Sequence, residues 1–357
     1  MRANAYLILE NGMTFEGEYF GAQGEITGEI VFTTGMTGYL ETLTDQSYYG
    51  QIVLQTFPLI GNYGVIPSDF ESAAVGARAY IVKYPCVTPS NFRSENNLGA
   101  FLKERGIIGL CGIDTRSLTK IIRENGVMNG KISASPPPPP GVELTAALAE
   151  VKTYSVLNAV AAVSSHNVTK TGEGSRRVAL MDFGAKRGIA KALAARGCEV
   201  WTFPHDATAA DILQKKPHGI MLSNGPGDPA EPANNGIIET IRALMQSEVP
   251  IFGICLGHQL LALAKGYQTK KLKFGHRGAN QPVKEIATGR VYITSQNHGY
   301  AVVADNGSFV NVNDGTCEGM DYGDSFSVQF HPEACSGPLD TSFLFDRFME
   351  RLNYAAR

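Results

Sequence analysis

Hydrophobic and polar positions alternate over short runs in the first 130 residues. The runs EIVFTTG and QIVLQTFP have the spacing of strands, and YLILENGMTFEG places Asn11-Gly12 between two such runs, as in a β-hairpin. Residues 116–124, RSLTKIIRE, instead have helical spacing, with apolar residues on one face and charged residues on the other. The pattern predicts a strand-rich first half with a helix covering the sheet.

A different pattern begins near Arg177, where wholly apolar runs alternate with amphipathic ones. The apolar runs VALMDFG, GIMLSNG and VPIFGIC alternate with helix-like segments such as KRGIAKALAARG and NGIIETIRALMQ. Strands this apolar are buried on both faces, and regular alternation with helices is typical of a parallel sheet. The fold class expected is α/β, with a strand-rich mixed N-terminal domain and a doubly wound, mainly parallel-sheet C-terminal domain. Functional groups gather at the carboxyl ends of such strands.

The segment between these halves has the composition of a connection. Pro136 to Pro140 form an unbroken run that can only be extended, and a weakly helical ELTAALAEV follows. Residues 164–177, SSHNVTKTGEGSRR, are polar and rich in Gly and Ser. The predicted domains are therefore 1–150 and 178–357, with a linker over 151–177.

Composition narrows the class of protein. The chain has 357 residues, 43% hydrophobic and 18% charged, which fits two globular domains. Its 31 basic and 34 acidic residues give a net charge of −3, which argues against nucleic acid or anionic lipid as a partner. Six cysteines are scattered singly without metal-ligand spacing, so we expect neither disulfides nor a metal site. With no signal-peptide or membrane-spanning pattern, the expected location is the reducing cytoplasm.

Cys255 lies where an apolar strand, predicted from Val249 to Ile254, runs directly into a helix over about Leu256 to Ala264. It is flanked two positions either way by Gly253 and Gly257. This GxCxG pattern is the cysteine form of a nucleophile elbow, in which larger flanking residues would prevent the turn from closing. A thiol at a helix amino terminus is favoured as thiolate. Lone cysteines are more often buried small hydrophobes, but the two glycines favour a nucleophile.

A thiol nucleophile requires a base, and His331 has the best context among the seven histidines. FSVQFHPE is predicted as a strand ending in His331, Pro332 and Glu333, and in an extended segment residues 331 and 333 point to the same side. The carboxylate can then orient the imidazole, which gives a Cys255, His331, Glu333 triad. His258 is predicted to be a surface or packing residue and His276 to lie in a Gly- and Arg-rich loop as a solvated or structural residue, while His298 in SQNHGY stays undecided.

Two further features could bind a substrate near the thiol. SNGPGDP (223–229) follows the apolar strand GIML, and its glycines could turn N–H groups toward an oxyanion, beside the N–H of Leu256. A merely tight turn explains the same residues about as well. Gln259 lies one helical turn after Cys255, so its amide could hydrogen-bond a substrate.

GICLGHQ, LSNGPGDP, TSQNHGY and QFHPE together resemble the class I (triad) glutamine amidotransferase family. Segments in both halves of the chain narrow this resemblance to one family of amidotransferases. Residues 32–64, 112–132 and 273–283 are similar to the small-subunit family of carbamoyl phosphate synthetase. The family's chemistry implies hydrolysis of glutamine to glutamate and ammonia, through a glutamyl thioester on Cys255 with His331 as general base and acid and Glu333 as its orienting partner.

The resemblance also implies binding residues, partners and cofactors. The implied glutamine contacts are Ser47, Gly225, Gly227, Leu256, Gln259, Asn297, Gly299 and Tyr300. Because Ser47 lies in the first domain, the substrate site is expected at the domain interface. A large synthetase subunit would receive the ammonia and combine it with bicarbonate, using ATP and Mg that are expected on that partner, since this chain has no GxxxxGK[ST] or GxGxxG motif. The sequence does not determine whether the product is used in pyrimidine or arginine synthesis. It also does not determine whether heterodimers associate into a higher oligomer.

Two alternatives belong to other classes of protein. One is a different enzyme with the same domain, such as the glutaminase part of an anthranilate or GMP synthetase, or a thiol hydrolase with a similar elbow. The first 130 residues argue against it, because those proteins lack them. The other is a non-catalytic regulatory protein with a decayed amidotransferase domain, and the presence of all three triad residues argues against that.

Overall fold

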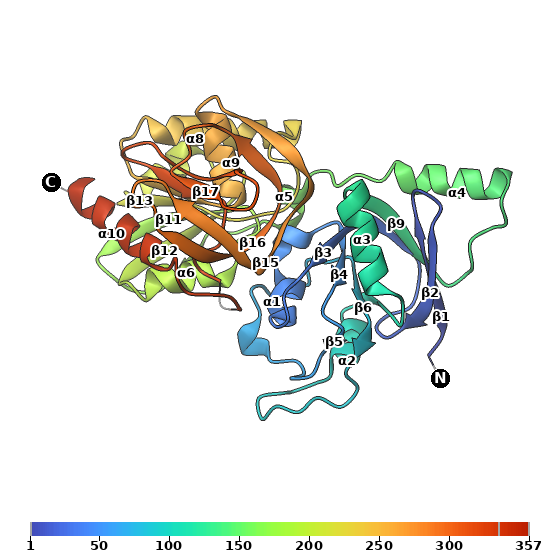
Figure 1. The fold of residues 1–357 in the computed structure, drawn as a ribbon. Helices are drawn as coiled ribbons and strands as arrows, with labels where there is room; N and C mark the ends of the chain where they lie inside the picture. Colours follow the sequence, from blue (N-terminus) through green and yellow to red (C-terminus); the bar gives the residue numbers. More distant parts are fainter. Residues whose placement is uncertain (1, 335, 356–357) are drawn as a thin grey trace. The chain divides into compact units, whose positions relative to one another are not determined.

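The computed structural model of the chain describes residues 2–334 and 336–355, with the side chains of 353–355 excluded (Figure 1). The chain forms two compact units, Met1–Val156 and Leu157–Arg357. The division falls inside the predicted linker 151–177. Within that stretch α5 (Ala159–Val163) is helical and β10 (Thr169–Thr171) pairs with β12 (Cys198–Pro204), so both elements belong to the second unit.

The first unit is a closed seven-stranded β-barrel with the strand order β1-β2-β8-β6-β4-β3-β9. These strands are β1 (Asn4–Leu9), β2 (Thr14–Tyr19), β3 (Ile26–Thr33), β4 (Gln51–Gln55), β6 (Ala79–Val82), β8 (Ile108–Cys111) and β9 (Met128–Ser133). The central pairs β3/β4, β4/β6 and β6/β8 are parallel, and the remaining pairs are antiparallel. This confirms the prediction of a strand-rich mixed domain.

Short elements cover the barrel and complete its core. They are α1 (Tyr39–Thr44), η1 (Gln46–Tyr48), the β5/β7 pair (Leu59–Ile60 and Tyr84–Pro85), η2 (Pro67–Asp69), α2 (Leu98–Glu104), α3 (Thr115–Asn125) and α4 (Val142–Lys152). The helix predicted at 116–124 is α3, which packs on β3 and β4 with Leu118 and Ile122 fully buried. The hairpin predicted at Asn11-Gly12 joins β1 to β2, and Gly12 has a φ of 88°, which glycine adopts without strain. Pro136–Pro140 are irregular and lead to α4.

The second unit is built on one ten-stranded sheet with the order β10-β12-β11-β13-β14-β19-β18-β17-β15-β16. Its five central strands are parallel: β12, β11 (Arg176–Asp182), β13 (Gly219–Leu222), β14 (Ile251–Ile254) and β19 (Phe326–Val328). The other strands pair antiparallel: β15 (Gln268–Glu285), β16 (Val291–Val303), β17 (Phe309–Asn311) and β18 (Cys317–Asp321).

Helices cover both faces of the parallel strands, as in a doubly wound fold (Figure 1). Successive residues of β11 enter opposite cores: Val178 and Leu180 pack with α6 (Arg187–Ala194) and α10 (Phe343–Ala355), whereas Ala179 and Met181 pack with α7 (Ala209–Gln214), α8 (Asn235–Met245) and α9 (Leu256–Ala264). Burial on both faces explains why these strands have no polar alternation. The fold class predicted from the apolar runs is confirmed.

The antiparallel strands β15 to β18 correct one sequence interpretation. His276 is not in a loop but in β15, opposite His298 of β16, and with only 8% of its surface exposed it is not a solvated residue. Burial lowers the pKa of His276, but the Glu318 and Asp314 carboxylates beside the ring outweigh this effect and raise it. The long strand was missed because its polar residues do not alternate in the way a half-buried strand predicts.

Two observations bear on the predicted environment. Five cysteines, Cys86, Cys111, Cys198, Cys255 and Cys317, are free thiols, and Cys335 lies outside the described residues. In the part of the chain that the structure describes, every helix is too short or too polar to span a bilayer.

Candidate active site

Cys255 occupies the turn between β14 and α9 with a φ of 54° and a ψ of −105°. A non-glycine residue with positive φ is strained, and it is retained here because the backbone on both sides is fixed. The N–H of Cys255 donates to the carbonyl of Val328 at 2.9 Å, and the N–H of Gly257 donates to that of Ser223 at 2.9 Å. The predicted elbow, with a helix from Leu256 to Ala264, is confirmed.

The two glycines flanking the elbow are required by different neighbours. A Cβ on Gly253 would lie 2.7 Å from the carbonyl oxygen of Gly257, and a Cβ on Gly257 would lie 2.3 Å from the carbonyl oxygen of Leu222. Both contacts are with backbone atoms that cannot rotate away. The GxCxG spacing therefore follows from close approach of backbone to backbone at positions 253 and 257.

We expect Gly257→Ala to destabilise the second unit by about 3 kcal/mol and to lower its Tm by about 6–12 °C, because the added methyl group meets fixed backbone. The matched control is Gly236→Ala in α8, where a Cβ meets nothing within 4 Å. That change should leave the Tm unchanged or raise it slightly, since alanine favours a helix. Calorimetry of both variants tests this, and equal Tm values would contradict the steric account.

His331 and Glu333 lie just beyond β19, which ends at Val328. The predicted strand through Glu333 is therefore wrong: residues 332 and 333 form a turn, and the N–H of Ala334 donates to the carbonyl of His331 at 3.3 Å. The turn nevertheless brings the two side chains together, with His331 Nδ1 and Glu333 Oε1 2.6 Å apart. Both side chains are fully buried.

The electrostatics of His331 are those of a base that retains a proton. Burial and the nearby Lys186 ammonium lower the pKa of His331. The Glu333 carboxylate and the Cys255 sulfur, through its charge and a hydrogen bond, outweigh them and raise the pKa to about 10. Among the described residues His331 Nε2 has no partner at full hydrogen-bonding geometry. This nitrogen can therefore hold the proton that the pair shares on the side facing the sulfur, and such contacts often tighten only when substrate binds.

The Glu333 carboxylate is kept ionised inside the protein. Burial raises the pKa of Glu333. The His331 ring, through its charge and a hydrogen bond, and the Lys186 charge outweigh burial, so the pKa is lowered overall. Glu333 also packs beside the first turn of α6, where a Cβ on Gly188 would lie 3.0 Å from its carbonyl oxygen. Sequence reasoning missed Lys186 and Gly188. Their position in GAKRG, at the carboxyl end of the buried strand β11, was the available signal.

The loop after β13 lies against the elbow. A Cβ on Gly225 would meet the Leu256 side chain at 2.8 Å, and Gly227 has a φ of 90°. Ser223 fixes the loop, because its carbonyl accepts from Gly257 and its hydroxyl oxygen accepts from the N–H of Phe183 at 2.9 Å. As the first residue of α9, Leu256 contributes one of the N–H groups that have no partner within the helix. These groups can bind an oxyanion next to the sulfur.

Strand β16 supplies the third side of the site. The carbonyl of Asn297 lies 3.6 Å from the Cys255 sulfur, and the amide Nε2 of Gln259 donates to the carbonyl of Tyr300 at 2.8 Å. Gln259 Nε2 also lies 2.9 Å from Gln329 Oε1, so this nitrogen holds the framework and its oxygen is the atom that could accept from a substrate. Gly299 lies between Asn297 and Tyr300 and is half-buried.

The second unit thus brings together the three triad residues and the elements that carry seven of the eight residues predicted to contact a substrate. Ser47 is the exception. It lies in η1 of the first unit, where its N–H donates to Asp45 Oδ1 at 2.9 Å, and its substrate contact stays a prediction. His258 was predicted to be a surface or a packing residue, and the structure shows that it is a packing residue. Its Nδ1 lies 2.8 Å from Ser327 Oγ, and burial lowers its pKa to about 3.

Comparisons with known proteins divide the chain in the same way. The carbamoyl-phosphate synthase small chain, CPSase domain, matches residues 7–132, and the class-I glutamine amidotransferase family matches residues 179–351. The carbamoyl phosphate synthase small chain of Clostridium perfringens is 48% identical over 352 residues, which cover 97% of this chain and 99% of that protein. The small chain of Bacillus caldolyticus is 49% identical, and the match covers 96% of this chain and 95% of that protein. The pyrimidine-specific small chain of Bacillus subtilis is 48% identical, and the match covers 97% of this chain and 95% of that protein.

Proposed function

The chain belongs to the carbamoyl phosphate synthase small chain family, and from this premise we propose that it hydrolyses glutamine and passes the ammonia to a large synthase chain. The observation that carries the proposal is the buried arrangement of a strained Cys255, His331 and Glu333 at one end of the parallel strands. Similarity over nearly the whole chain, including the barrel unit, supports this function over that of an amidotransferase of another synthetase.

The proposed reaction begins with His331 protonated, because its imidazole has already taken the Cys255 proton. The sulfur attacks the side-chain amide carbon of glutamine, and the resulting oxyanion is met by N–H groups near Gly227 and Leu256. His331 then protonates the departing nitrogen, so ammonia leaves and a glutamyl thioester remains. A water molecule gives a proton to His331, attacks the thioester and releases glutamate and the free thiol.

Each remaining residue has a proposed position around glutamine. The backbone at Gly225, Gly227 and Leu256 and the Gln259 amide surround the reacting carbon, and the β16 backbone and side chains at Asn297, Gly299 and Tyr300 bind the amino-acid end. We propose Ser47 as a contact from the first unit, supported by the similarity of its sequence segment to the family.

ATP and Mg are proposed to bind the large chain, since this chain has no phosphate-binding glycine motif. The free thiols support a reducing cytoplasmic location.

Reconstitution with a large carbamoyl phosphate synthase chain tests the function. With glutamine labelled by ¹⁵N in the side-chain amide, we expect label in carbamoyl phosphate and one glutamate for each carbamoyl phosphate. The large chain alone, given the same glutamine, is the control and should form neither product. Glutamate without labelled carbamoyl phosphate would indicate a glutaminase of another class, and no glutamate at all would indicate a non-catalytic protein.

A further inference from the structure

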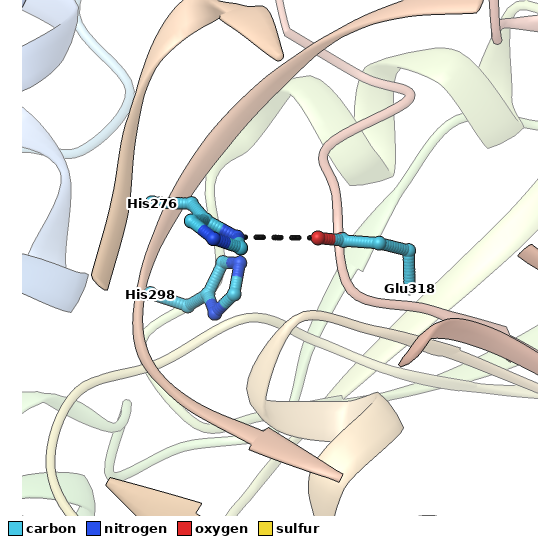
Figure 2. A group of neighbouring side chains, drawn as sticks. All are labelled: His276, His298 and Glu318. Atoms are coloured by element: carbon cyan, nitrogen blue, oxygen red, sulfur yellow. Dashed lines mark hydrogen bonds and ion pairs between the residues drawn. The ribbon is translucent and has the colours of Figure 1, made fainter. Parts of the chain in front are cut away.

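A second cluster of chemically active side chains lies in the antiparallel part of the sheet, outside the triad. His276, His298 and Glu318 project toward one another from β15, β16 and β18 (Figure 2). All three are buried, and one ligand atom from each lies within 4.8 Å of the others. The two imidazole rings meet edge to face with their centres 4.9 Å apart. The proposed hydrolysis of glutamine assigns no step to these three side chains.

The outer nitrogen of each imidazole is held by an oxygen. His276 Nε2 lies 2.9 Å from Asp314 Oδ2, and His298 Nδ1 lies 2.7 Å from the carbonyl oxygen of Tyr300. A neutral imidazole that donates its N–H outward in this way has its lone pair on the other nitrogen, which faces the cluster. Histidines that bind metals have this arrangement, with the outer N–H donated to a carboxylate or a backbone carbonyl.

The inner nitrogens also face oxygens. His276 Nδ1 lies 3.2 Å from Glu318 Oε1, and His298 Nε2 lies 3.1 Å from Gln296 Oε1. The Gln296 amide is oriented by its nitrogen, which donates to Glu318 Oε2 at 3.0 Å and to Thr294 Oγ1 at 3.1 Å. With the outer N–H groups placed as above, the inner pair at His298 consists of two acceptors, and the inner pair at His276 does so when that ring is neutral, with Asn311 Nδ2 also 3.4 Å from His276 Nδ1. Such a contact is favourable only when a proton or a metal cation lies between the two atoms.

The separations fit shared coordination. Two ligand atoms about 2.1 Å from one ion, with an angle of about 95–100° between them, lie about 3.1–3.2 Å apart. Both inner pairs have this spacing. Atoms up to 4.8 Å apart would have to move about 1.5 Å closer for full coordination, so we expect binding to draw the strands together.

The surroundings supply charge, support and access. The Glu318 side chain is fully buried, and Asn311 Nδ2 donates to its Oε1 at 3.0 Å, which fixes the carboxylate in place. The side chain of Asp314 is 44% exposed and lies at the His276 edge, so this edge of the cluster reaches the surface of the unit. Arg277 opposes binding, because its positive charge acts on His298.

We propose that His276 Nδ1, His298 Nε2 and Glu318 Oε1, with Gln296 Oε1 as a fourth donor, bind one divalent cation of the zinc class. Two imidazoles and a carboxylate are a common ligand set for Zn²⁺ and for Co²⁺, which replaces it in the same geometry. The ion joins β15 and β16 to β18, and β16 also carries Asn297, Gly299 and Tyr300. Its role is therefore to hold the strand that borders the sulfur.

Titration of the full chain with Co²⁺ alone tests the site. A Cys255→Ser background removes the thiol that would compete for the ion. We expect one Co²⁺ per chain by metal analysis, visible absorption bands without a thiolate charge-transfer band, displacement by Zn²⁺ and a Tm that rises with Co²⁺ concentration. Failure to bind Co²⁺ or Zn²⁺ at millimolar concentration would overturn the proposal.

Three substitutions in that background locate the ion. Glu318→Gln keeps the shape of the side chain and removes the charged ligand, so Co²⁺ affinity should fall at least about 100-fold. Asp314→Asn changes only an exposed partner of His276 and should weaken binding about 10- to 100-fold without disturbing the fold. His166→Gln, at an exposed position, is the matched control and should bind as the parent does. Unchanged affinity in both the Glu318 and the Asp314 variants would place the ion elsewhere and overturn the assignment.

Discussion

Replacing Cys255 with serine should abolish glutamine-dependent synthesis of carbamoyl phosphate by the two-chain enzyme and leave ammonia-dependent synthesis unchanged. The expected loss is about 10³-fold or more, because the sulfur forms the covalent bond on which both halves of the hydrolysis depend. The hydroxyl of serine is far less acidic, and the site is organised around a sulfur 3.6 Å from the Asn297 carbonyl. Steady-state assays with glutamine and with ammonium chloride measure the two activities separately.

The control for this substitution is Cys86→Ser, which changes a partly exposed thiol in the first unit. It should retain both activities. Equal loss of glutamine-dependent and ammonia-dependent synthesis in Cys255→Ser would show that the substitution disrupts the assembly instead of the chemistry, and would remove Cys255 as the nucleophile.

The second large effect is expected from His331→Asn, which should slow glutamine hydrolysis about 10³-fold. Without the imidazole no group takes the thiol proton or protonates the departing nitrogen, so the first step stalls. In wild-type protein mixed with glutamine and quenched in acid, mass spectrometry should find a glutamyl adduct on Cys255. In His331→Asn the adduct should form slowly or not at all.

Alkylation of Cys255 gives a readout that does not depend on substrate. His331 has its pKa raised to about 10, so near neutral pH it is the charged partner of the sulfur. Its loss should slow the reaction of Cys255 with iodoacetamide, whereas His166→Asn at an exposed position should react as wild type does. A His331→Asn variant that hydrolyses glutamine at the wild-type rate would exclude His331 from the mechanism.

The local features of the site could be predicted because they depend on neighbours in the chain. The GxCxG spacing fixes the elbow, since backbone atoms leave no room for a Cβ at Gly253 or Gly257. His331 and Glu333 are two residues apart, so they meet in a strand or in a turn. The prediction of their contact therefore survived an error in its reasoning, because the strand ends at Val328 and the contact is made in a turn.

Contacts between distant segments could not be predicted in the same way. Lys186 and Gly188 reach Glu333 from more than a hundred residues away, and although GAKRG follows a buried strand, it does not indicate which carboxylate these residues meet. The cluster of His276, His298 and Glu318 was missed for the same reason. Its members lie in three strands whose order in the sheet differs from their order in the chain.

The sequence by itself determined the two-part organisation and the doubly wound sheet, and it predicted which residues act as the nucleophile and its base. These follow from short-range periodicity and from the steric limits on backbone at a tight turn. Only the tertiary structure decided which polar groups share a buried space, including the Lys186 charge beside the triad and the two histidines beside Glu318. Burial strengthens interactions between such groups, and which groups are buried together depends on how strands distant in the chain pair and pack.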